Sequence, residues 1–234
     1  MSTTVHSSID DQELIVERRK QFVAAATALF GRNSYESTTM KEISKQAGFS
    51  SGLIYSYVQT KEDMLFLVLQ NLLDSYQREI PKSLENVLDP IERFCTAVRA
   101  YCRVIDANAD ATLLAYRATK SISSERKAEI KEMELVTNRL VADCVRSCVD
   151  AGYFRPLNVH LMAYQVVIVA HGWALKRWAL RHVMTLEEYV SETVNMFLHG
   201  ALTEVGWQHR KKGETGIAAS VPMQQGHGSS FGHG

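Results

Sequence analysis

Apolar residues recur at helical spacing along the chain, and the elements that they outline are helices. Near the start, Phe22, Ala26, Leu29 and Phe30 stand at positions i, i+4, i+7 and i+8, the apolar stripe of a helix that we expect Gly31 to end. No stretch shows a convincing strand pattern. The sequence therefore predicts an all-α protein, and the periodic segments and their caps add up to nine helices.

A capping box opens the second of these helices. The Thr39 hydroxyl is placed to accept the amide of Glu42, while the Glu42 side chain reaches back to the Thr39 amide. Ile43 and Ala47 share one face, and Gly48 can take the left-handed conformation that stops a helix without a Cβ penalty. We expect this helix from residue 39 to about 47.

A short third helix is expected to begin at Ser50, whose hydroxyl can cap it. Its buried side would be Ile54 with Tyr57 or Val58. Small or hydroxyl-bearing side chains occupy the outer positions, so backbone amides and the helix dipole can approach a phosphate. Those outer residues are Ser51, Gly52, Leu53, Tyr55 and Ser56. A helix, a tight turn and a bare second helix together predict a surface that binds DNA, although capped helix pairs with a glycine turn also occur without that role.

Residues 38–65 resemble the DNA-binding domain of the TetR family of bacterial repressors. Departures from the family pattern are Ser44, Phe49, Val58 and Thr60, each similar in polarity to the usual residue. The resemblance implies three helices in a DNA-binding domain and six in a larger effector-binding and dimerisation domain. The family positions are occupied by Thr39, Ile43, Ala47, Gly48, Ser50, Gly52, Ile54, Tyr55, Tyr57, Lys61, Glu62 and Leu65.

The same resemblance predicts how DNA is contacted. A homodimer would place two recognition helices in successive major grooves of a palindromic, double-stranded DNA operator. A helix over 61–79, capped by Thr60 and stopped at Pro81, would carry ligand-driven tilt between the domains. The expected phosphate contacts are Thr39, Ser51, Tyr55, Tyr57 and Lys61, and the residues expected near base edges are Gly52, Leu53 and Ser56, with Ser50 at the cap.

Later caps divide the rest of the chain. Asp89 with Pro90 opens a helix to about 106, and Asn108 to Asp110 a short one to about 120. The remaining helices are expected at 124–151, closed by Gly152, at 158–183, preceded by Asn158, and at 185–209, opened by a capping box at Thr185. We accordingly predict a flexible arm (1–11), a helix-turn-helix domain (12–62), a helical effector and dimerisation domain (63–209) and a disordered tail (210–234) rich in Lys, Gly, Ser, Gln and His.

Composition and charge are those of an ordinary globular protein. Of 234 residues, 46% are hydrophobic and 22% charged, and 26 basic residues balance 26 acidic ones, which by itself does not favour a nucleic-acid partner. The balance is uneven, however: residues 14–61 hold seven basic and three acidic side chains, a net charge of plus four. The predicted DNA-binding region is therefore locally basic.

The sequence gives no sign of export or of a membrane span. Residues 1–11 are polar, so we expect a cytoplasmic protein without a secretory signal. The most apolar stretch, Leu161 to Leu175, is interrupted by Gln165 and His171 and is shorter than the roughly 18 to 20 residues that a span needs. We interpret it as a buried helix and expect no membrane partner.

The effector site is predicted less sharply. Trp173, Arg177 and Arg181 repeat every four residues, so that with His171 one face would hold an anion beside an apolar body. The alternative is a dimer-interface flank, because the resemblance implies that helices 158–183 and 185–209 pair between two subunits. Further pocket candidates are Phe94, Tyr101, Tyr116 and Arg117.

The kind of effector is inferred from a looser resemblance to family members that sense fatty acyl-CoA thioesters. We expect a small lipophilic molecule, such as an acyl-CoA, and no other cofactor. Aromatic xenobiotics and other lipophilic metabolites are the alternatives.

Other classes of function find little support. A glycine-rich phosphate loop, Gly-x-Ser-x-Gly and His-Glu-x-x-His are all absent, so we predict that the protein is not an enzyme. Cysteines 95, 102, 144 and 148 form no Cys-x-x-Cys and are expected to be reduced core residues rather than a metal or thiol sensor. His227 and His233 are assigned to the disordered tail rather than to metal. A helical adaptor that binds protein through residues 158–209 without DNA is the alternative function.

Overall fold

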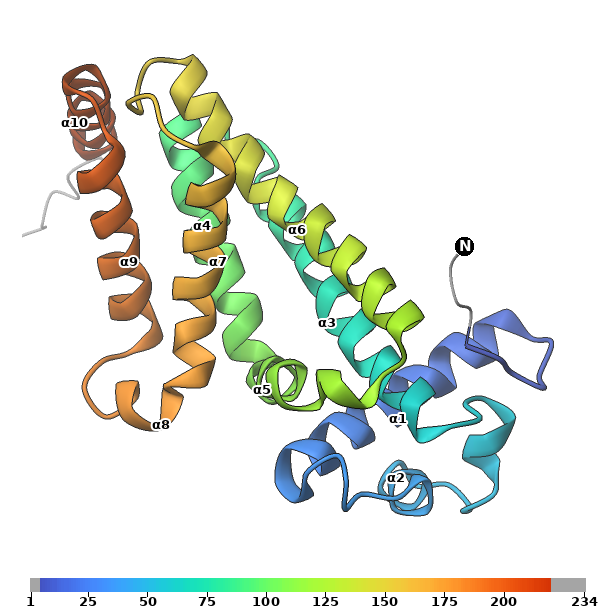
Figure 1. Cartoon of the computed structure of the whole chain (residues 1–234). Helices are drawn as coiled ribbons and strands as arrows, with labels where there is room; N and C mark the ends of the chain where they lie inside the picture. The colour runs from blue at the N-terminus through green and yellow to red at the C-terminus, as the bar shows by residue number, and fades with distance from the viewer. Residues whose placement is uncertain (1–4, 220–234) are drawn as a thin grey trace, which may run out of the picture.

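The computed structural model describes residues 5–219, with the backbone alone from 213 to 219. Within this range the chain is helical, and its one strand-like pairing is an isolated bridge between Phe154 and Leu202 (Figure 1). The α-helices are α1 (Gln12–Asn33), α2 (Met40–Gln46), α3 (Lys61–Ser83), α4 (Pro90–Ala107), α5 (Ala109–Ala118), α6 (Ser124–Asp150), α7 (Val159–Leu175), α8 (Arg177–Leu180), α9 (Leu186–Ala201) and α10 (Glu204–Ala219), and the 3₁₀ helices are η1 (Leu53–Ser56) and η2 (Thr119–Ser121).

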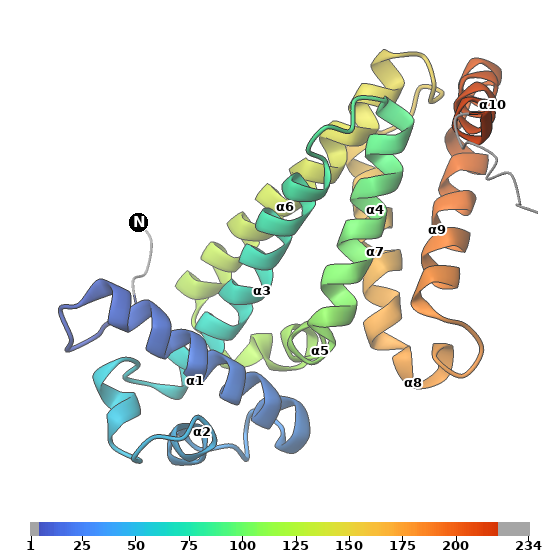
Figure 2. The same ribbon diagram turned by 180° about the vertical axis from the view of Figure 1, so that it is seen from behind.

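Helix α3 connects the two parts of the molecule. Its first turn lies with α1, α2 and η1 in a small domain, and the rest of it runs alongside α6 into a larger bundle (Figures 1 and 2). The bundle also contains α4, α5 and α7, and α9 packs on α4, with α10 at the end far from the small domain. Helix α1 packs against both α3 and α5, so the small domain lies directly on the bundle.

Most predicted helix starts are confirmed by their caps. The capping box at Thr39 is formed, with Thr39 N 2.8 Å from Glu42 Oε2 and Glu42 N 3.2 Å from Thr39 Oγ1. Asp89, Asn158 and Thr185 cap α4, α7 and α9 as expected. The long helix α6 starts one residue earlier than predicted, because Ser123 is its cap in place of the expected Ser124.

Two predicted helix ends are wrong. Helix α1 continues past Gly31 to Asn33, and Gly31 serves a close approach instead, because a Cβ there would lie 3.2 Å from the Asp110 side chain on α5. Helix α3 continues through Pro81 to Ser83. Pro81 is tolerated because it removes a single amide donor in the last turn, and the Leu84 amide still reaches the Ile80 carbonyl at 3.2 Å.

The last two predicted helices are each divided. The segment 158–183 ends as α7 at Leu175, because Lys176 leaves the helical conformation (φ −115°, ψ 14°) before the short α8. The segment 185–209 breaks at Leu202, which is extended and lies beside the chain that follows α6: Arg155 N donates to Ala201 O at 2.9 Å. These long-range backbone bonds interrupt what the sequence predicts as one helix.

The predicted tail is helical where it is described. Helix α10 extends to Ala219, so residues 210–219 are not a disordered segment, whereas 220–234, including His227 and His233, lie outside the described residues. Helix α10 is fixed at its start. A Cβ on Gly206 would lie 2.4 Å from the Tyr153 carbonyl oxygen, and the His209 ring stacks on Tyr153 and pairs with Asp89.

The predicted flexible arm is also partly wrong. Residues 1–4 lie outside the described range, but Val5 is buried, and the amide of Ser8 donates to the Ser56 carbonyl at 2.9 Å. The Ser7 hydroxyl donates to the same carbonyl, also at 2.9 Å. Residues 5–11 therefore pack on the small domain, an arrangement that a short polar segment does not reveal in its sequence.

The helical domain buries the four cysteines, as predicted, and none forms a disulfide. Helix α7 is only half-buried, contrary to the prediction of a buried helix: Leu161, Tyr164 and Ile168, spaced as neighbours on one face, are exposed. In the described part of the chain, no helix is both long and apolar enough to cross a membrane.

Candidate DNA-reading surface and effector cluster

The recognition segment, residues 50–57, is a turn with a short 3₁₀ helix rather than the α-helix predicted from Ser50. Ser51 and Gly52 form a turn that leads into the four-residue 3₁₀ helix η1, which has no side-chain cap. Ser50 takes part through its backbone, because its carbonyl accepts a 2.6 Å hydrogen bond from the Ser44 hydroxyl. A single 3₁₀ turn presents fewer aligned amides than an α-helix, so the predicted helix-dipole contribution to phosphate binding is not available here.

Most of the predicted DNA-contacting residues lie at the surface of this segment. Tyr55 is 51% exposed, and Ser50, Gly52 and Thr39 are exposed as well. Ser51, Leu53 and Ser56 are partly exposed. Ile54 is fully buried, as expected, and anchors the turn from below. The result is a surface of hydroxyl groups and a glycine, with Tyr55 and the partly exposed Leu53 as its bulky side chains.

Tyr57 has a structural position that does not fit the predicted phosphate contact. Its side chain is only 4% exposed, and its ring centroid lies 6.0 Å from that of Phe22 on α1. Tyr57 therefore belongs to the core of the small domain, which agrees with the alternative expectation that it forms the buried side of the segment.

Lys61 is likewise engaged within the protein. Its Nζ donates to the carbonyl oxygens of Tyr35, Glu36 and Thr38 at 2.9, 3.0 and 3.0 Å, and it lies 4.5 Å from the Tyr35 ring centroid. An ammonium group has three hydrogen-bond donors, and all three are used. The prediction that Lys61 contacts phosphate is thus replaced by a role in holding the 34–38 loop against the start of α3.

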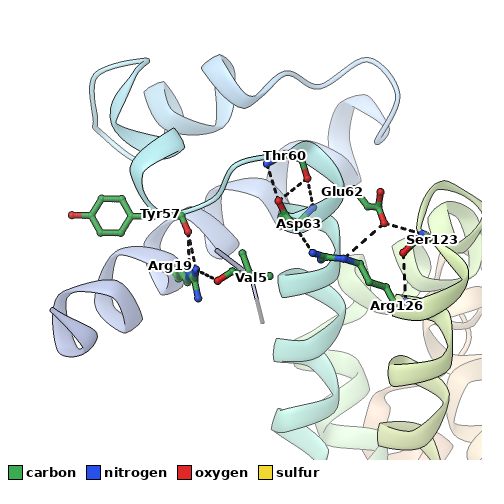
Figure 3. Close-up of polar contacts among 8 residues, drawn as sticks. All are labelled: Val5, Arg19, Tyr57, Thr60, Glu62, Asp63, Ser123 and Arg126. Atoms are coloured by element: carbon green, nitrogen blue, oxygen red, sulfur yellow. Dashed lines mark hydrogen bonds and ion pairs between the residues drawn. The ribbon is translucent and has the colours of Figure 1, made fainter. Parts of the chain in front are cut away.

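Arg19 on α1 holds the far end of the recognition segment. Its Nε and Nη2 donate to the Tyr57 carbonyl at 3.1 and 2.9 Å, and Nη2 also reaches the Val5 carbonyl at 2.6 Å (Figure 3). Burial lowers the pKa of Arg19, while the Asp63 carboxylate acts in the opposite sense. A guanidinium bound to backbone carbonyls fixes the position of the turn without occupying its outer surface.

A buried ion pair joins this domain to the bundle immediately after the recognition segment. Asp63, in the first turn of α3, completes a capping box with Thr60 and also pairs with Arg126 of α6, the two side chains being 12% and 11% exposed (Figure 3). Glu62 accepts the Ser123 amide at 2.8 Å, so the start of α6 contacts two successive carboxylates of α3. We call these contacts the α3–α6 junction.

The predicted effector residues separate into groups, one of which lies inside the bundle. The Tyr116 hydroxyl is 2.8 Å from His171 Nδ1, and the Tyr101 ring lies 5.9 Å from that of His171. Tyr76 of α3, which the sequence did not indicate, stacks on Tyr101 at 4.5 Å. The carboxyl group of Glu134 on α6, which the sequence also did not indicate, contributes to raising the pKa of all three tyrosines. We call Tyr76, Tyr101, Tyr116, Glu134 and His171 the tyrosine cluster.

The protonation states of the tyrosine cluster favour uncharged groups. Burial lowers the pKa of His171 to about 4, so its imidazole is neutral at ordinary pH. Burial also raises the pKa of the Glu134 carboxyl, partly opposed by Lys131, and raises the pKa of Tyr101 well above its usual value. The cluster is thus a set of neutral hydrogen-bonding groups with one carboxyl at its edge.

The remaining predicted effector residues lie elsewhere. Trp173 Nε1 and Arg177 Nη2 both contact Asp106 Oδ1, at 2.8 and 3.2 Å, so Arg177 already has a carboxylate partner, which weighs against the predicted anion-binding face. Phe94 packs among other phenylalanines at the opposite end of α4. Arg117 is exposed on α5 and stays a prediction.

Two protein-family models match successive parts of the chain. Residues 22–68 match the model of bacterial regulatory proteins of the tetR family, and residues 87–200 match the tetracyclin repressor-like C-terminal domain. The chain is 46% identical over 203 residues to the HTH-type transcriptional regulator HbdR of Aromatoleum sp. (strain CIB), covering 87% of this chain and 89% of that protein. It is 24% identical over 191 residues to the HTH-type transcriptional repressor KstR2 of Mycobacterium tuberculosis, covering 81% and 94%.

Solved structures agree in fold. AibR in complex with isovaleryl coenzyme A and operator DNA superposes with a TM-score of 0.67 at 18% identity, covering 76% of this chain and 97% of AibR. A structure of KstR2 of Mycobacterium tuberculosis gives a TM-score of 0.67 at 22% identity, covering 86% and 100%. With both domain models matched and a relative at 46% identity over nearly the whole length, this chain belongs to the TetR family of DNA-binding transcriptional regulators.

Proposed function

We propose that this regulator is a repressor that binds a palindromic operator as a homodimer and leaves it when a small lipophilic effector enters the helical domain. The observation that carries the proposal is the accessible, hydroxyl-rich face of the recognition segment, fixed from behind by Ile54 and Arg19. KstR2 is named a repressor, which supports the proposal of repression. AibR binds both isovaleryl coenzyme A and operator DNA, which supports the proposal of a small lipophilic effector. Binding to chromosomal DNA would place the protein in the cytoplasm.

The proposed DNA contacts follow the exposure of the side chains. Ser50, Ser51 and Tyr55 would donate hydroxyl hydrogen bonds to phosphate oxygens, and this binding would fix the register of the protein on the duplex. Thr39 would do so only by turning its hydroxyl from Glu42 Oε2, to which it donates at 2.8 Å. Gly52, Leu53 and Ser56 would lie against base edges or thymine methyl groups. Lys41 and Lys45, exposed one turn apart on α2, would add two charges to the phosphate contacts.

The proposed dimer uses α7 and α9. Leu161, Tyr164 and Ile168 form an exposed face on α7, and on α9 the side chain of Met196 is 55% exposed. Contiguous apolar side chains on a helical face of a globular protein mark a contact surface. Pairing of two such faces would set the spacing of the two recognition segments.

The proposed signal passes along α3. Tyr76 in the tyrosine cluster and Asp63 at the α3–α6 junction lie on this one helix, and α6 contributes both Glu134 and Arg126. A ligand that separates the helices at the cluster would therefore shift the first turn of α3 and the recognition segment that precedes it. Two states with different effector affinity are required, and the orientation of α3 would distinguish them.

An electrophoretic mobility shift assay tests the proposal. The test duplex is the DNA upstream of the protein's own gene, and the control is a scrambled duplex of equal length. The expected result is a shift of the first duplex alone, weaker at higher salt because phosphate contacts release counterions. A short-chain acyl-CoA, with free CoA as the matched control, is expected to reverse the shift. No shift at low ionic strength would contradict DNA binding and favour the adaptor, and a shift that neither thioester nor other lipophilic compounds reverse would contradict the effector step.

A further inference from the structure

We propose that the tyrosine cluster recognises an uncharged hydroxyl or carbonyl group carried by an apolar effector. This inference rests on the proposed function, because it defines which part of the effector enters the helical domain. It concerns the oxygen that is bound there and not the group that carries the effector's charge.

The hydroxyl of Tyr76 is the first observation. Its side chain is 1% exposed, and the oxygen has no hydrogen-bond partner in the structure. The nearby Thr112 hydroxyl acts to lower the pKa of Tyr76, but its own proton goes to the Asn108 carbonyl at 3.1 Å, and it lies outside hydrogen-bonding geometry to the Tyr76 oxygen. A buried hydroxyl without a partner costs stability, and such groups are rare in folded proteins. An oxygen supplied by a ligand would satisfy it.

The second observation is that residues from five helices are linked to Tyr76 by ring contacts, a hydrogen bond and electrostatic interaction. Tyr76 comes from α3, Tyr101 from α4, Tyr116 from α5, Glu134 from α6 and His171 from α7. Stacked and edge-on rings enclose these groups: Tyr76 with Tyr101 at 4.5 Å, and Tyr116 with His171 at 5.7 Å. Apolar walls with a few convergent polar groups are the usual composition of a small-molecule site.

Charge distribution excludes an anionic group from the same position. The charged side chains that act on the cluster are Glu134 and, through it, Lys131, while Arg177 is paired with Asp106. A carboxylate or phosphate would therefore lie beside Glu134, an exposed residue whose carboxyl pKa is nevertheless raised by partial burial, and without a guanidinium partner; burying an anion in that way carries a large desolvation cost. A hydroxyl or carbonyl group needs no counter-ion.

Tyr116 provides the route of entry. It is 50% exposed, and its hydroxyl bond to His171 Nδ1 closes the solvent side of the cluster. A ligand oxygen can replace this bond, because neutral histidine and tyrosine each offer both a donor and an acceptor. Entry thus exchanges one hydrogen bond at the surface for new ones at Tyr76 and His171.

Three probes of nearly equal size test the inference: p-cresol, toluene and benzoate. Their dissociation constants for the full-length protein are measured by ligand-observed NMR titration. We expect p-cresol to bind roughly tenfold more tightly than toluene, the ratio for about one net hydrogen bond, and benzoate to bind most weakly. Equal binding of p-cresol and toluene, or tightest binding of benzoate, would overturn the proposal.

Matched variants locate the site. Tyr76→Phe keeps the ring and removes the orphan hydroxyl, so the preference for p-cresol over toluene should fall to within about twofold. Tyr153→Phe removes a hydroxyl that binds His209, outside the cluster, and should keep the full preference. Glu134→Gln should narrow the difference between benzoate and p-cresol. A Tyr76→Phe protein that retains the full preference would contradict the assignment.

The same samples separate this inference from the proposed function. An operator shift by the unmodified protein, together with equal affinity for p-cresol and toluene, refutes the inference alone. Preference for p-cresol with no shift of any duplex refutes the proposed function and leaves the chemistry of the cluster intact.

Discussion

The two ends of α3 are built in different ways. At the DNA-reading end, neighbouring residues fix each element: Thr39 with Glu42, Thr60 with Asp63, and Gly48 at φ +84°. At the effector end, the important contacts join residues far apart in sequence, such as Tyr116 with His171. The helix starts and the turn at the reading end are therefore encoded locally, although Arg19 and Lys61 add long-range contacts there, whereas the tyrosine cluster exists only when five helices pack correctly.

The α3–α6 junction lies where these two kinds of structure meet. Asp63 closes a local capping box and also forms a long-range ion pair with Arg126. One Arg126 nitrogen, Nη1, is buried without a partner, so the pair is not fully satisfied in this state. Because the pair lies between the domains, we expect the proposed coupling, as well as stability, to depend on it.

Breaking the junction should have the largest effect. Arg126→Ala leaves the Asp63 carboxylate buried without its counter-ion, and we expect the free energy of unfolding to fall by about 3 kcal/mol. Urea unfolding measures this loss. Arg78→Ala, which removes an exposed pair with Glu79, is the matched control and should change stability by less than about 0.5 kcal/mol. Equal losses in the two variants would contradict a buried, functional pair.

The effector end should lose stability as the pH falls below 6.5, whereas Glu42 at the reading end, whose pKa is lowered from 4.5 by its hydrogen bonds to Thr39, acts only at lower pH. The pKa of His171 is lowered from 6.5 to about 4, so the unfolded chain takes up a proton there before the folded chain does. Its contribution is complete above pH 6.5 and is lost as the pH falls toward 4, at up to about 1.4 kcal/mol per pH unit. His171→Gln should flatten this part of the stability profile in urea titrations. The raised pKa of Glu134 acts in the opposite sense and is the same in both proteins, so an unchanged profile in the variant would contradict the buried neutral histidine.

Two glycines of the reading end provide a smaller, matched comparison. Gly48 has φ +84°, whereas Gly52 has φ −87°, and neither has an atom within 4 Å of an added Cβ. Gly48→Ala should therefore destabilise the fold by about 1–2 kcal/mol through backbone strain alone. Gly52→Ala should leave the thermal unfolding midpoint nearly unchanged while weakening operator binding. Equal melting of the two variants would contradict the left-handed turn.

The smallest expected effect is that of Tyr55→Phe. The hydroxyl is exposed in the free protein, so its removal should not change stability. Operator affinity should fall by roughly tenfold if the hydroxyl donates to a phosphate. Fluorescence anisotropy with a labelled duplex measures the change, and Tyr164→Phe on the exposed face of α7 is the control. Unchanged affinity would remove Tyr55 from the contact set.

The sequence predicted what short-range chemistry determines. The caps of α2, α3, α4 and α7 and the turn at Gly48 follow from residues within four positions of one another. It did not predict the breaks at Lys176 and Leu202, because the latter depends on backbone bonds to a segment about fifty residues earlier.

The same limit explains the errors at the candidate sites. Lys61 and Tyr57 stand at family positions, but their partners, the Tyr35 carbonyl and the Phe22 ring, come from α1 and the loop after it. Tyr76 is buried and Glu134 is exposed, both in ordinary amphipathic helices, and no local pattern distinguishes them from other residues of these helices. Only the packed bundle brings them together with His171.

Photo-crosslinking tests the central claim, that the exposed face of the recognition segment reads DNA, most directly. A benzophenone amino acid is placed at Tyr55 and, in a second protein, at Trp178, which is 71% exposed on α8. Each is irradiated with the duplex recovered by selection from a random library. The account predicts a covalent DNA adduct from position 55 and none from position 178. An adduct from position 178 alone, or from neither position while the duplex remains bound, would contradict it.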